Sequence, residues 1–238
     1  MRQTASRAAL LGSCQYWARV GVPWDESTGR SAKMGDEYHK AIAPVVDATL
    51  ATPPFPPTTK WFRERFAHGV AWVDANGVPG MRAEAAYAYD PEADTARLLG
   101  YDIGRKYEEH GKLAHEIAGS ADIVWLDGDT VHVRDWKTGR SVTDAVWPQL
   151  EWLGLFAVRA TPGARIAVAG ALHVTDYGVG GPAPRMFGEA DLKTIANEIR
   201  ERSAMVADAW PEPSENCDGC YCPARPACDL YQLRKKVA

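Results

Sequence analysis

The sequence has 238 residues, 46% of them hydrophobic and 24% charged, which is the composition of a globular chain with a sizeable core. Its formal net charge is −4, which argues against a protein that coats nucleic acid through phosphate contacts alone, because such proteins carry a strongly basic surface. No apolar run approaches the roughly 20 residues of a membrane span, and the N-terminus lacks the apolar core of a secretory signal. We therefore expect a cytoplasmic protein without a membrane partner, whose five cysteines bind metal or act in catalysis rather than form disulfides.

The first third of the chain is predicted to be helical. Apolar residues at helical spacing predict one helix over residues 6–17, a second over 33–50 and a short third over 60–73. A turn-rich stretch at 21–29 separates the first two helices, and the prolines of 53–57 end the second.

The middle of the chain changes to the alternation that is typical of strands. A strand is expected over 82–89, and the strongest hairpin signal is a pair of apolar runs, 117–126 and 130–137, around a short turn that contains Gly128. Further along we expect a helix near 143–159, a strand over 165–174 and a long amphipathic helix over 189–210.

This order of elements predicts an α/β fold, with a mixed central sheet of about four to five strands flanked by helices. We expect a single domain with three parts, which are a helical N-terminal part (1–74), a core (82–210) and a cysteine-rich C-terminal tail (211–238).

The hairpin GSADIVWLDGDTVHVRDWKTG (119–139) carries charged residues in a pattern that suits phosphodiester hydrolysis. Asp122 and Asp135 can meet across its two strands, and Asp135 and Lys137 share one strand face because they are two residues apart. Carboxylates that hold divalent ions lower the pKa of an attacking water, and a neighbouring lysine can stabilise the charge that develops on the phosphate. The alternative is a solvated hairpin whose Asp and Lys form a surface ion pair.

The hairpin resembles the second and third motifs of the PD-(D/E)XK nuclease superfamily, specifically its RecB-like branch, where the ending D-x-K-T-G is usual. Upstream, MGDEYHKA (34–41) is similar to the G-x-x-x-H motif of that branch. Downstream, Gln149 stands where a Q-x-x-x-Y motif is expected, but the fourth residue after it is Leu153 rather than Tyr. Trp152 and Phe156 are the candidates for supplying the missing ring. The resemblance covers essentially the whole chain and implies a core of the restriction-endonuclease type.

The resemblance also implies roles for individual residues. The implied magnesium or manganese ligands are His39, Asp122, Asp135 and the Trp136 carbonyl, and the implied catalytic residues are Asp122, Asp135, Lys137 and Gln149. Lys137 would position the nucleophile. The role of Glu84 stays open between a contact to metal or DNA and an ordinary carboxylate on a strand face. The candidate phosphate contacts, each with simple solvation as its alternative, are Lys33, Arg63, Arg65, Arg105 and Lys106.

Four cysteines lie within twelve residues of the tail, at Cys217, Cys220, Cys222 and Cys228. Thiolates at this density suit zinc or an iron–sulfur cluster. In several RecB-like nucleases, one early cysteine joins three C-terminal ones around a 4Fe–4S cluster, and the resemblance implies that Cys14 does so here, in a structural role. One of Cys217, Cys220 and Cys222 is then not a ligand. The alternative is a zinc site formed by the tail alone.

These patterns predict a metal-dependent DNA nuclease. The resemblance to CRISPR-associated and phage RecB-like exonucleases implies action on free ends or single-stranded DNA, and protein partners in a recombination or CRISPR-adaptation complex. The alternative is a DNA-binding or adaptor module with an inactive site. The missing tyrosine and the acidic net charge favour this alternative, whereas the intact Asp122, Asp135 and Lys137 argue against it.

Overall fold

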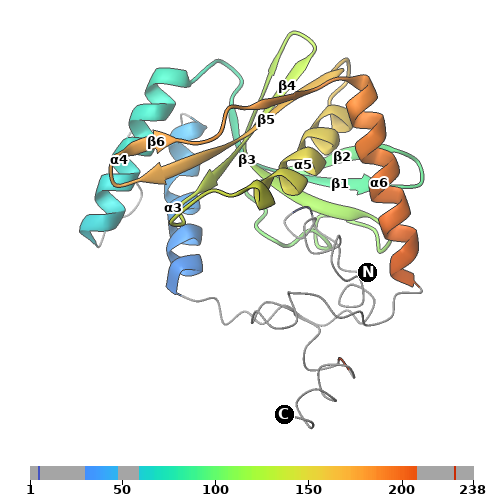
Figure 1. Cartoon of the computed structure of the whole chain (residues 1–238), viewed down its shortest axis with the longest axis horizontal. Helices are drawn as coiled ribbons and strands as arrows, with labels where there is room; N and C mark the ends of the chain where they lie inside the picture. Colours follow the sequence, from blue (N-terminus) through green and yellow to red (C-terminus); the bar gives the residue numbers. More distant parts are fainter. Residues whose placement is uncertain (1–4, 6–29, 48–58, 208–227, 229–238) are drawn as a thin grey trace.

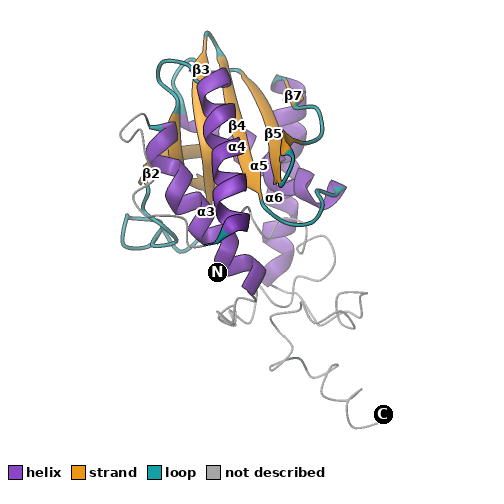
Figure 2. Cartoon of the chain, turned by 90° about the vertical axis from the view of Figure 1, so that its left-hand side faces the viewer, coloured by secondary structure: helices purple, strands orange, loops and turns teal. Residues whose placement is uncertain are grey.

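The computed structural model describes residue 5, residues 30–47 and 59–207, and residue 228. These residues form three layers, with a twisted sheet between helices on its two faces (Figure 1, Figure 2). The elements in chain order are α3 (Arg30–Val46), α4 (Lys60–Asn76), β1 (Arg82–Asp90), β2 (Thr95–Tyr101), β3 (Ile117–Asp127), β4 (Thr130–Lys137), the 3₁₀ turn η2 (Asp144–Val146), α5 (Trp147–Ala160), β5 (Ile166–Thr175), β6 (Gly178–Gly180), β7 (Arg185–Phe187) and α6 (Glu189–Ala207).

The sheet runs in the order β2-β1-β3-β4-β5-β6, and β7 also pairs with β5. Among the strands of the described residues, only β4 and β5 are parallel neighbours, and α5 forms the crossover between them. All other pairs are antiparallel. The hairpin turn between β3 and β4 contains Gly128 at φ 60, a left-handed backbone that glycine adopts without steric cost.

The helices α5 and α6 cover one face of the sheet and form the larger core with it. The residues of α5 are buried on nearly every side of the helix, so α5 lies between the sheet and α6. Glu189 and Asp191 lie in the first turn of α6, where their charge complements the positive end of the helix dipole.

The helices α3 and α4 cover the opposite face, as the view in Figure 2 shows, and form a second core with Ile123, Trp136 and Leu172 of the sheet. Thr59 caps α4, because its Oγ1 accepts a hydrogen bond from Phe62 N at 3.2 Å. Each face of the sheet therefore has its own apolar cluster, and polar residues can meet where the two clusters adjoin.

The mixed α/β architecture that the sequence predicts is confirmed, and the predicted elements from 33 to 210 correspond to α3, α4, β1, the β3–β4 hairpin, α5, β5 and α6. Within the part of the chain that the structure describes, the sheet has seven strands rather than the expected four to five. The additional strands gave no signal because β2 is mostly exposed or half-exposed and β6 and β7 are three residues each, too short for an alternating pattern. The predicted helix over 6–17 lies outside the described residues. Over 30–47 and 59–207, no helix is long and apolar enough to cross a membrane.

Candidate metal centre

His39, Glu84 and Asp122 converge from three elements, α3, β1 and β3. His39 Nδ1 lies 3.3 Å from Asp122 Oδ1 and 3.9 Å from Glu84 Oε1. One possible ligand atom from each residue lies within 4.8 Å of those of the other two. One imidazole and two carboxylates at this separation form a donor set that suits a divalent ion such as manganese or magnesium.

The strand register places Glu84 opposite Asp122. Ala83 pairs with Ile123 and Ala85 pairs with Ala121, so position 84 faces position 122 across β1 and β3. Asp47, directly after α3, accepts a hydrogen bond from Ala83 N at 2.8 Å and thereby attaches the end of α3 beside Glu84.

Glu84 has a left-handed backbone, with φ 49, which is uncommon for a residue other than glycine. Its neighbours face opposite sides of the sheet, since Ala83 belongs to the core under α3 and α4 and Ala85 to the core under α5. Strict alternation would put both on one side, so the chain changes face at Glu84, as it does at a β-bulge. Asp102 N donates to Glu84 O at 3.0 Å and holds this conformation. Strained backbones of this kind gather at functional sites.

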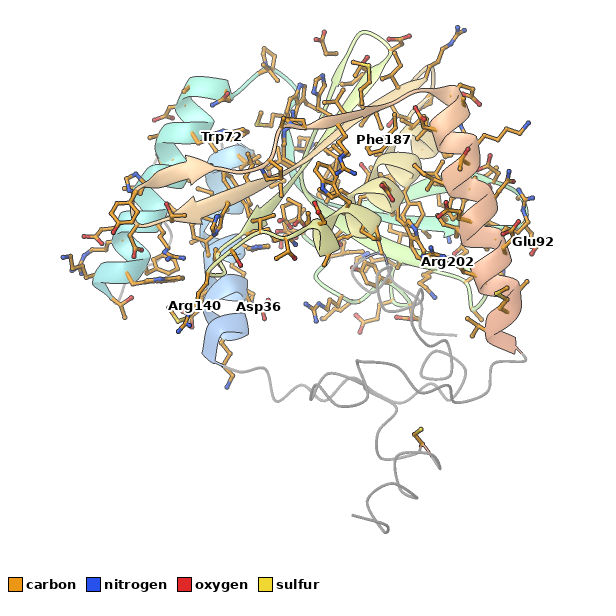
Figure 3. The ribbon with its side chains drawn as sticks, in the orientation of Figure 1. Asp36, Trp72, Glu92, Arg140, Phe187 and Arg202 are labelled. Carbon is orange, nitrogen blue, oxygen red and sulfur yellow. The ribbon has the colours of Figure 1, made fainter. Side chains whose placement is uncertain are left out.

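His39 is oriented by the tight packing of its neighbour Tyr38. Tyr38 is fully buried, and its ring contacts Trp136 edge-on with 5.8 Å between ring centroids. This contact fixes the rotation of α3 about its axis, so the next residue points toward Glu84 and Asp122. In Figure 3 the reader can find this part of α3 from the labelled Asp36, which lies one helical turn before His39.

Asp135, Lys137 and Gln149 form a second group beside this one. Lys137 Nζ makes an ion pair with Asp135 Oδ2 and donates to Gln149 Oε1 at 3.2 Å. Gln149 Nε2 in turn donates to Asp135 Oδ1 at 3.1 Å. The two groups are joined through β3 and β4, because Trp136 N donates to Asp122 Oδ2 at 2.6 Å.

The electrostatics of the centre reflect crowded carboxylates in a buried place. Burial raises the pKa of Glu84 to about 8, and the nearby charge of Asp122 adds to this effect. Burial also raises the pKa of Asp135, although Lys137 opposes the shift. Burial lowers the pKa of His39, but Asp122 outweighs it and the net pKa is about 9. The three carboxylates of Glu84, Asp122 and Asp135 have His39 and Lys137 as their cationic partners. A bound cation would stabilise these carboxylates, so the residues present fit a divalent metal.

Two sequence-based hypotheses about the aromatic ring after Gln149 are wrong. Trp152 and Phe156 are 2% and 0% exposed and lie within the core between α5, α6 and the sheet, and Leu153 is 0% exposed there too. Because α5 is buried on nearly every side, none of these side chains can reach a bound nucleic acid. The tyrosine expected four residues after Gln149 has no aromatic replacement on α5.

The candidate phosphate contacts differ in their surroundings. Arg65 is held inside the protein, since its Nε donates to Asp176 Oδ1 at 2.8 Å and its Nη1 donates to Thr138 O at 2.6 Å. With its Nε and Nη1 engaged and a 12% exposed side chain, Arg65 supports the loop after Lys137. Lys33, Arg63, Arg105 and Lys106 are exposed.

The cysteine predictions fall mostly outside the described residues, which contain Cys228 but not Cys14, Cys217, Cys220 or Cys222. Cys228 is buried, 8% exposed. Glu84 is the residue whose role the sequence left open and which the structure brings to the centre. In the sequence, Glu84 could be noticed only as an acidic residue on the strand before the hairpin. The direction of its side chain depends on a backbone irregularity that no local pattern predicts.

Comparison with known proteins gives a family for the chain. A family model described as the PD-(D/E)XK nuclease superfamily matches residues 2–229. No curated protein matches the chain. Six chains among the solved structures match. One of them, described as the crystal structure of SSO0001, is 17% identical with a TM-score of 0.47, and the match covers 94% of this chain and 85% of that chain.

Proposed function

The chain belongs to the PD-(D/E)XK nuclease superfamily, and on this basis we propose that it hydrolyses phosphodiester bonds of DNA at the centre that contains His39, Glu84 and Asp122. The observation that carries the proposal is the convergence of these three side chains next to Asp135 and Lys137. Metal-dependent cleavage is the activity of the superfamily. The choice of DNA, of these residues and of magnesium or manganese is our proposal.

The chemistry divides between the metal and the side chains. His39, Glu84, Asp122, Asp135 and the Trp136 carbonyl would hold one or two ions, which supply a water of lowered pKa and neutralise phosphate charge. Lys137 presents an ammonium group whose position is set by Asp135 and Gln149, so it can orient the attacking water and stabilise the charge of the transition state. Gln149 keeps Asp135 and Lys137 in a fixed relation, because it bonds to both.

The proposals about the branch of the superfamily, the form of the DNA substrate, the iron–sulfur cluster and the partners rest on the sequence motifs. The D-x-K-T-G ending and the order of His39 before the hairpin support membership of the RecB-like branch, and with it an exonuclease that acts on free ends or single-stranded DNA in the cytoplasm. The density of cysteines in the tail supports a 4Fe–4S cluster with Cys14 as its early ligand. Partners in a recombination or CRISPR-adaptation complex belong to the same proposal.

The test is cleavage of labelled nucleic acid in magnesium and in manganese. Linear single-stranded DNA, linear duplex DNA, circular single-stranded DNA and RNA distinguish the substrate and the need for a free end. Asp135→Asn keeps the size of the side chain but removes its charge, and should lower the rate by roughly 100-fold or more. Asp74→Asn, the same change at an exposed position on α4, should cleave like the unmodified protein.

Full activity of the Asp135→Asn protein would show that the centre is assigned wrongly. DNA binding without cleavage in either metal would instead support the adaptor module, in which the same residues serve only to dock DNA.

A further inference from the structure

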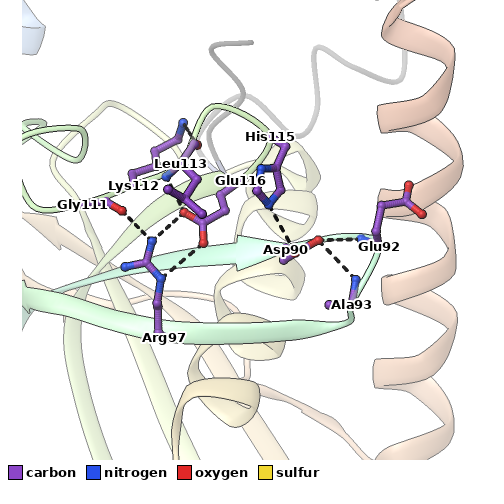
Figure 4. A network of polar contacts seen from close by, with 9 residues as sticks. All are labelled: Asp90, Glu92, Ala93, Arg97, Gly111, Lys112, Leu113, His115 and Glu116. Carbon is purple, nitrogen blue, oxygen red and sulfur yellow. Dashed lines mark hydrogen bonds and ion pairs between the residues drawn. The ribbon is translucent and has the colours of Figure 1, made fainter.

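The segment 102–116 between β2 and β3 is held in place by a network of polar contacts at its end (Figure 4). Arg97 of β2 donates to Glu116 Oε2 and to Gly111 O, both at 2.7 Å. Glu116, 7% exposed at its side chain, also accepts from Leu113 N at 2.6 Å. His115 adds a contact to Asp90 at 3.3 Å. These contacts fix the end of the segment, and the side chains earlier in the segment are therefore held in place as well.

Tyr107, within this segment, lies on the same side of the sheet as the metal centre. Its hydroxyl is 3.0 Å from Ser120 Oγ on β3. Gly119 faces Leu153 and Phe156 of α5, so Ser120 faces away from α5. Asp122, two residues further along β3, contacts His39 of α3, which also covers the face opposite α5.

The charged groups of the metal centre affect the pKa of Tyr107. Burial raises the pKa of Tyr107, and the carboxylates of Glu84 and Asp122 act in the same direction, whereas the hydrogen bond with Ser120 and the charge of Arg105 lower it. The charges of both carboxylates and of the exposed Arg105 therefore act on this hydroxyl. Ser120 and Asp122 are two residues apart on β3, a spacing of roughly 7 Å along a strand. This is about the separation of neighbouring phosphates in a nucleic acid strand.

A phosphate-bearing substrate needs hydrogen-bond donors on this side of the centre. Lys137 approaches from β4, but Glu84, Asp122 and Asp135 repel a polyanion unless other groups face it. A tyrosine hydroxyl has one donor and can also accept. If Ser120 donates to Tyr107, the Tyr107 proton remains for a phosphate oxygen.

We propose that Tyr107 is a substrate-binding residue, whose hydroxyl donates a hydrogen bond to a phosphate of the strand held at the metal centre, with Arg105 beside it. This inference rests on the proposed nuclease function. It assigns the substrate contact to the segment between β2 and β3, on the side of the sheet away from the buried Leu153 of α5.

Two matched variants separate substrate binding from support of the segment. Tyr107→Phe removes the hydroxyl and keeps the ring. Ser120→Ala removes the partner of the hydroxyl within the protein but leaves the hydroxyl itself. If the hydroxyl binds phosphate, Tyr107→Phe should lower kcat/KM on single-stranded DNA by roughly tenfold, mainly through KM, and Ser120→Ala should change it by less than about threefold.

Binding provides a readout that does not need cleavage. In the Asp135→Asn background, fluorescence anisotropy with a labelled oligonucleotide should show a Kd raised roughly tenfold by Tyr107→Phe and little changed by Ser120→Ala. Equal losses in the two variants, or no loss with Tyr107→Phe, would overturn the assignment and leave the hydroxyl as a support of the segment.

The two proposals fail in different ways. If the unmodified protein binds DNA but does not cleave it, the nuclease proposal fails while the anisotropy result still decides the role of Tyr107. If neither the unmodified protein nor any variant binds the oligonucleotide, both proposals are overturned.

Discussion

The left-handed backbone of Glu84 holds a carboxylate against Asp122 in a buried place, which opposes folding unless something compensates. A metal that binds the folded protein and not the unfolded chain would provide this compensation. Glu84 should therefore affect stability in opposite directions with and without metal.

We predict that, above about pH 8, where the Glu84 carboxyl is ionised, Glu84→Gln raises the melting temperature in EDTA, because the amide removes one of the crowded charges while keeping the size of the side chain. The increase in melting temperature on adding manganese should shrink, because one ligand has lost its charge. Thermal unfolding with and without manganese measures both effects. Glu92→Gln, at the exposed turn after β1, is the control and should behave like the unmodified protein. An unchanged response of Glu84→Gln to manganese would remove Glu84 from the ligand set.

At the scale of elements, Arg65 ties α4 to two other parts of the fold. One guanidinium joins the loop after β4, through Thr138 O, and the turn between β5 and β6, through Asp176. Its guanidinium carbon also lies 4.4 Å from the centre of the Trp61 ring. The loop that it supports follows directly after Lys137, so α4 helps to hold the end of β4 in place.

We predict that Arg65→Ala lowers the free energy of unfolding by about 1–3 kcal/mol, since Thr138 O and Asp176 lose a charged donor. Urea denaturation measures this loss. Lys60→Ala on the same helix removes only an exposed pair with Glu64 and should cost at most about 0.5 kcal/mol. Weaker DNA binding with unchanged stability would instead favour the role that the sequence suggested for Arg65, a phosphate contact.

The burial of α5 leads to a prediction about its incomplete motif. Leu153→Tyr restores the residue that the Q-x-x-x-Y pattern expects, but Leu153 lies in the core, and Leu153 Cδ2 would be only 2.8 Å from a Cβ on Gly119. We expect the larger ring to destabilise the protein by about 1–3 kcal/mol and not to improve DNA binding. Leu153→Met, which nearly conserves volume, should cost less than about 1.5 kcal/mol. Tighter DNA binding by the stable Leu153→Tyr protein would contradict the orientation of α5.

At the scale of the whole molecule, the metal centre lies where the two apolar cores adjoin. The residues of the centre and of the group beside it, Asp135, Lys137 and Gln149, come from α3, β1, β3, β4 and α5, so the two groups meet only when both layers of helices are in place. Ala5 is packed in the core under α5, so this residue near the start of the chain belongs to the folded body.

We predict that the chain ends are held by a 4Fe–4S cluster. Protein purified without oxygen should be brown, with broad absorption at roughly 400 nm. Cys14→Ala and Cys228→Ala should each remove the colour and lower the melting temperature of the whole protein, because a ligand from one end closes a very long loop. One of Cys217, Cys220 and Cys222 should tolerate Ala with the colour retained. One equivalent of zinc without iron, and a harmless Cys14→Ala, would leave only a local site in the tail.

Local patterns were enough for the hairpin and for most of the helices and long strands. Asp122, Asp135 and Lys137 come together because two adjacent strands and a two-residue spacing are sufficient to define their relation, and Gln149 follows on the next helix. Such contacts depend on short-range periodicity, which a single sequence contains.

The contacts of Glu84, Arg65 and α5 were decided by the tertiary structure. Glu84 turns toward the centre through a backbone that changes face within β1, and Arg65 bonds to residues 73 and 111 positions away. The helix α5 places Leu153 and its neighbours inward because α6 covers the side that the sheet does not. These contacts depend on which surfaces, far apart in the sequence, pack together in the fold. Long-range packing of this kind produces no periodic pattern in the sequence around each residue, so local patterns do not predict it.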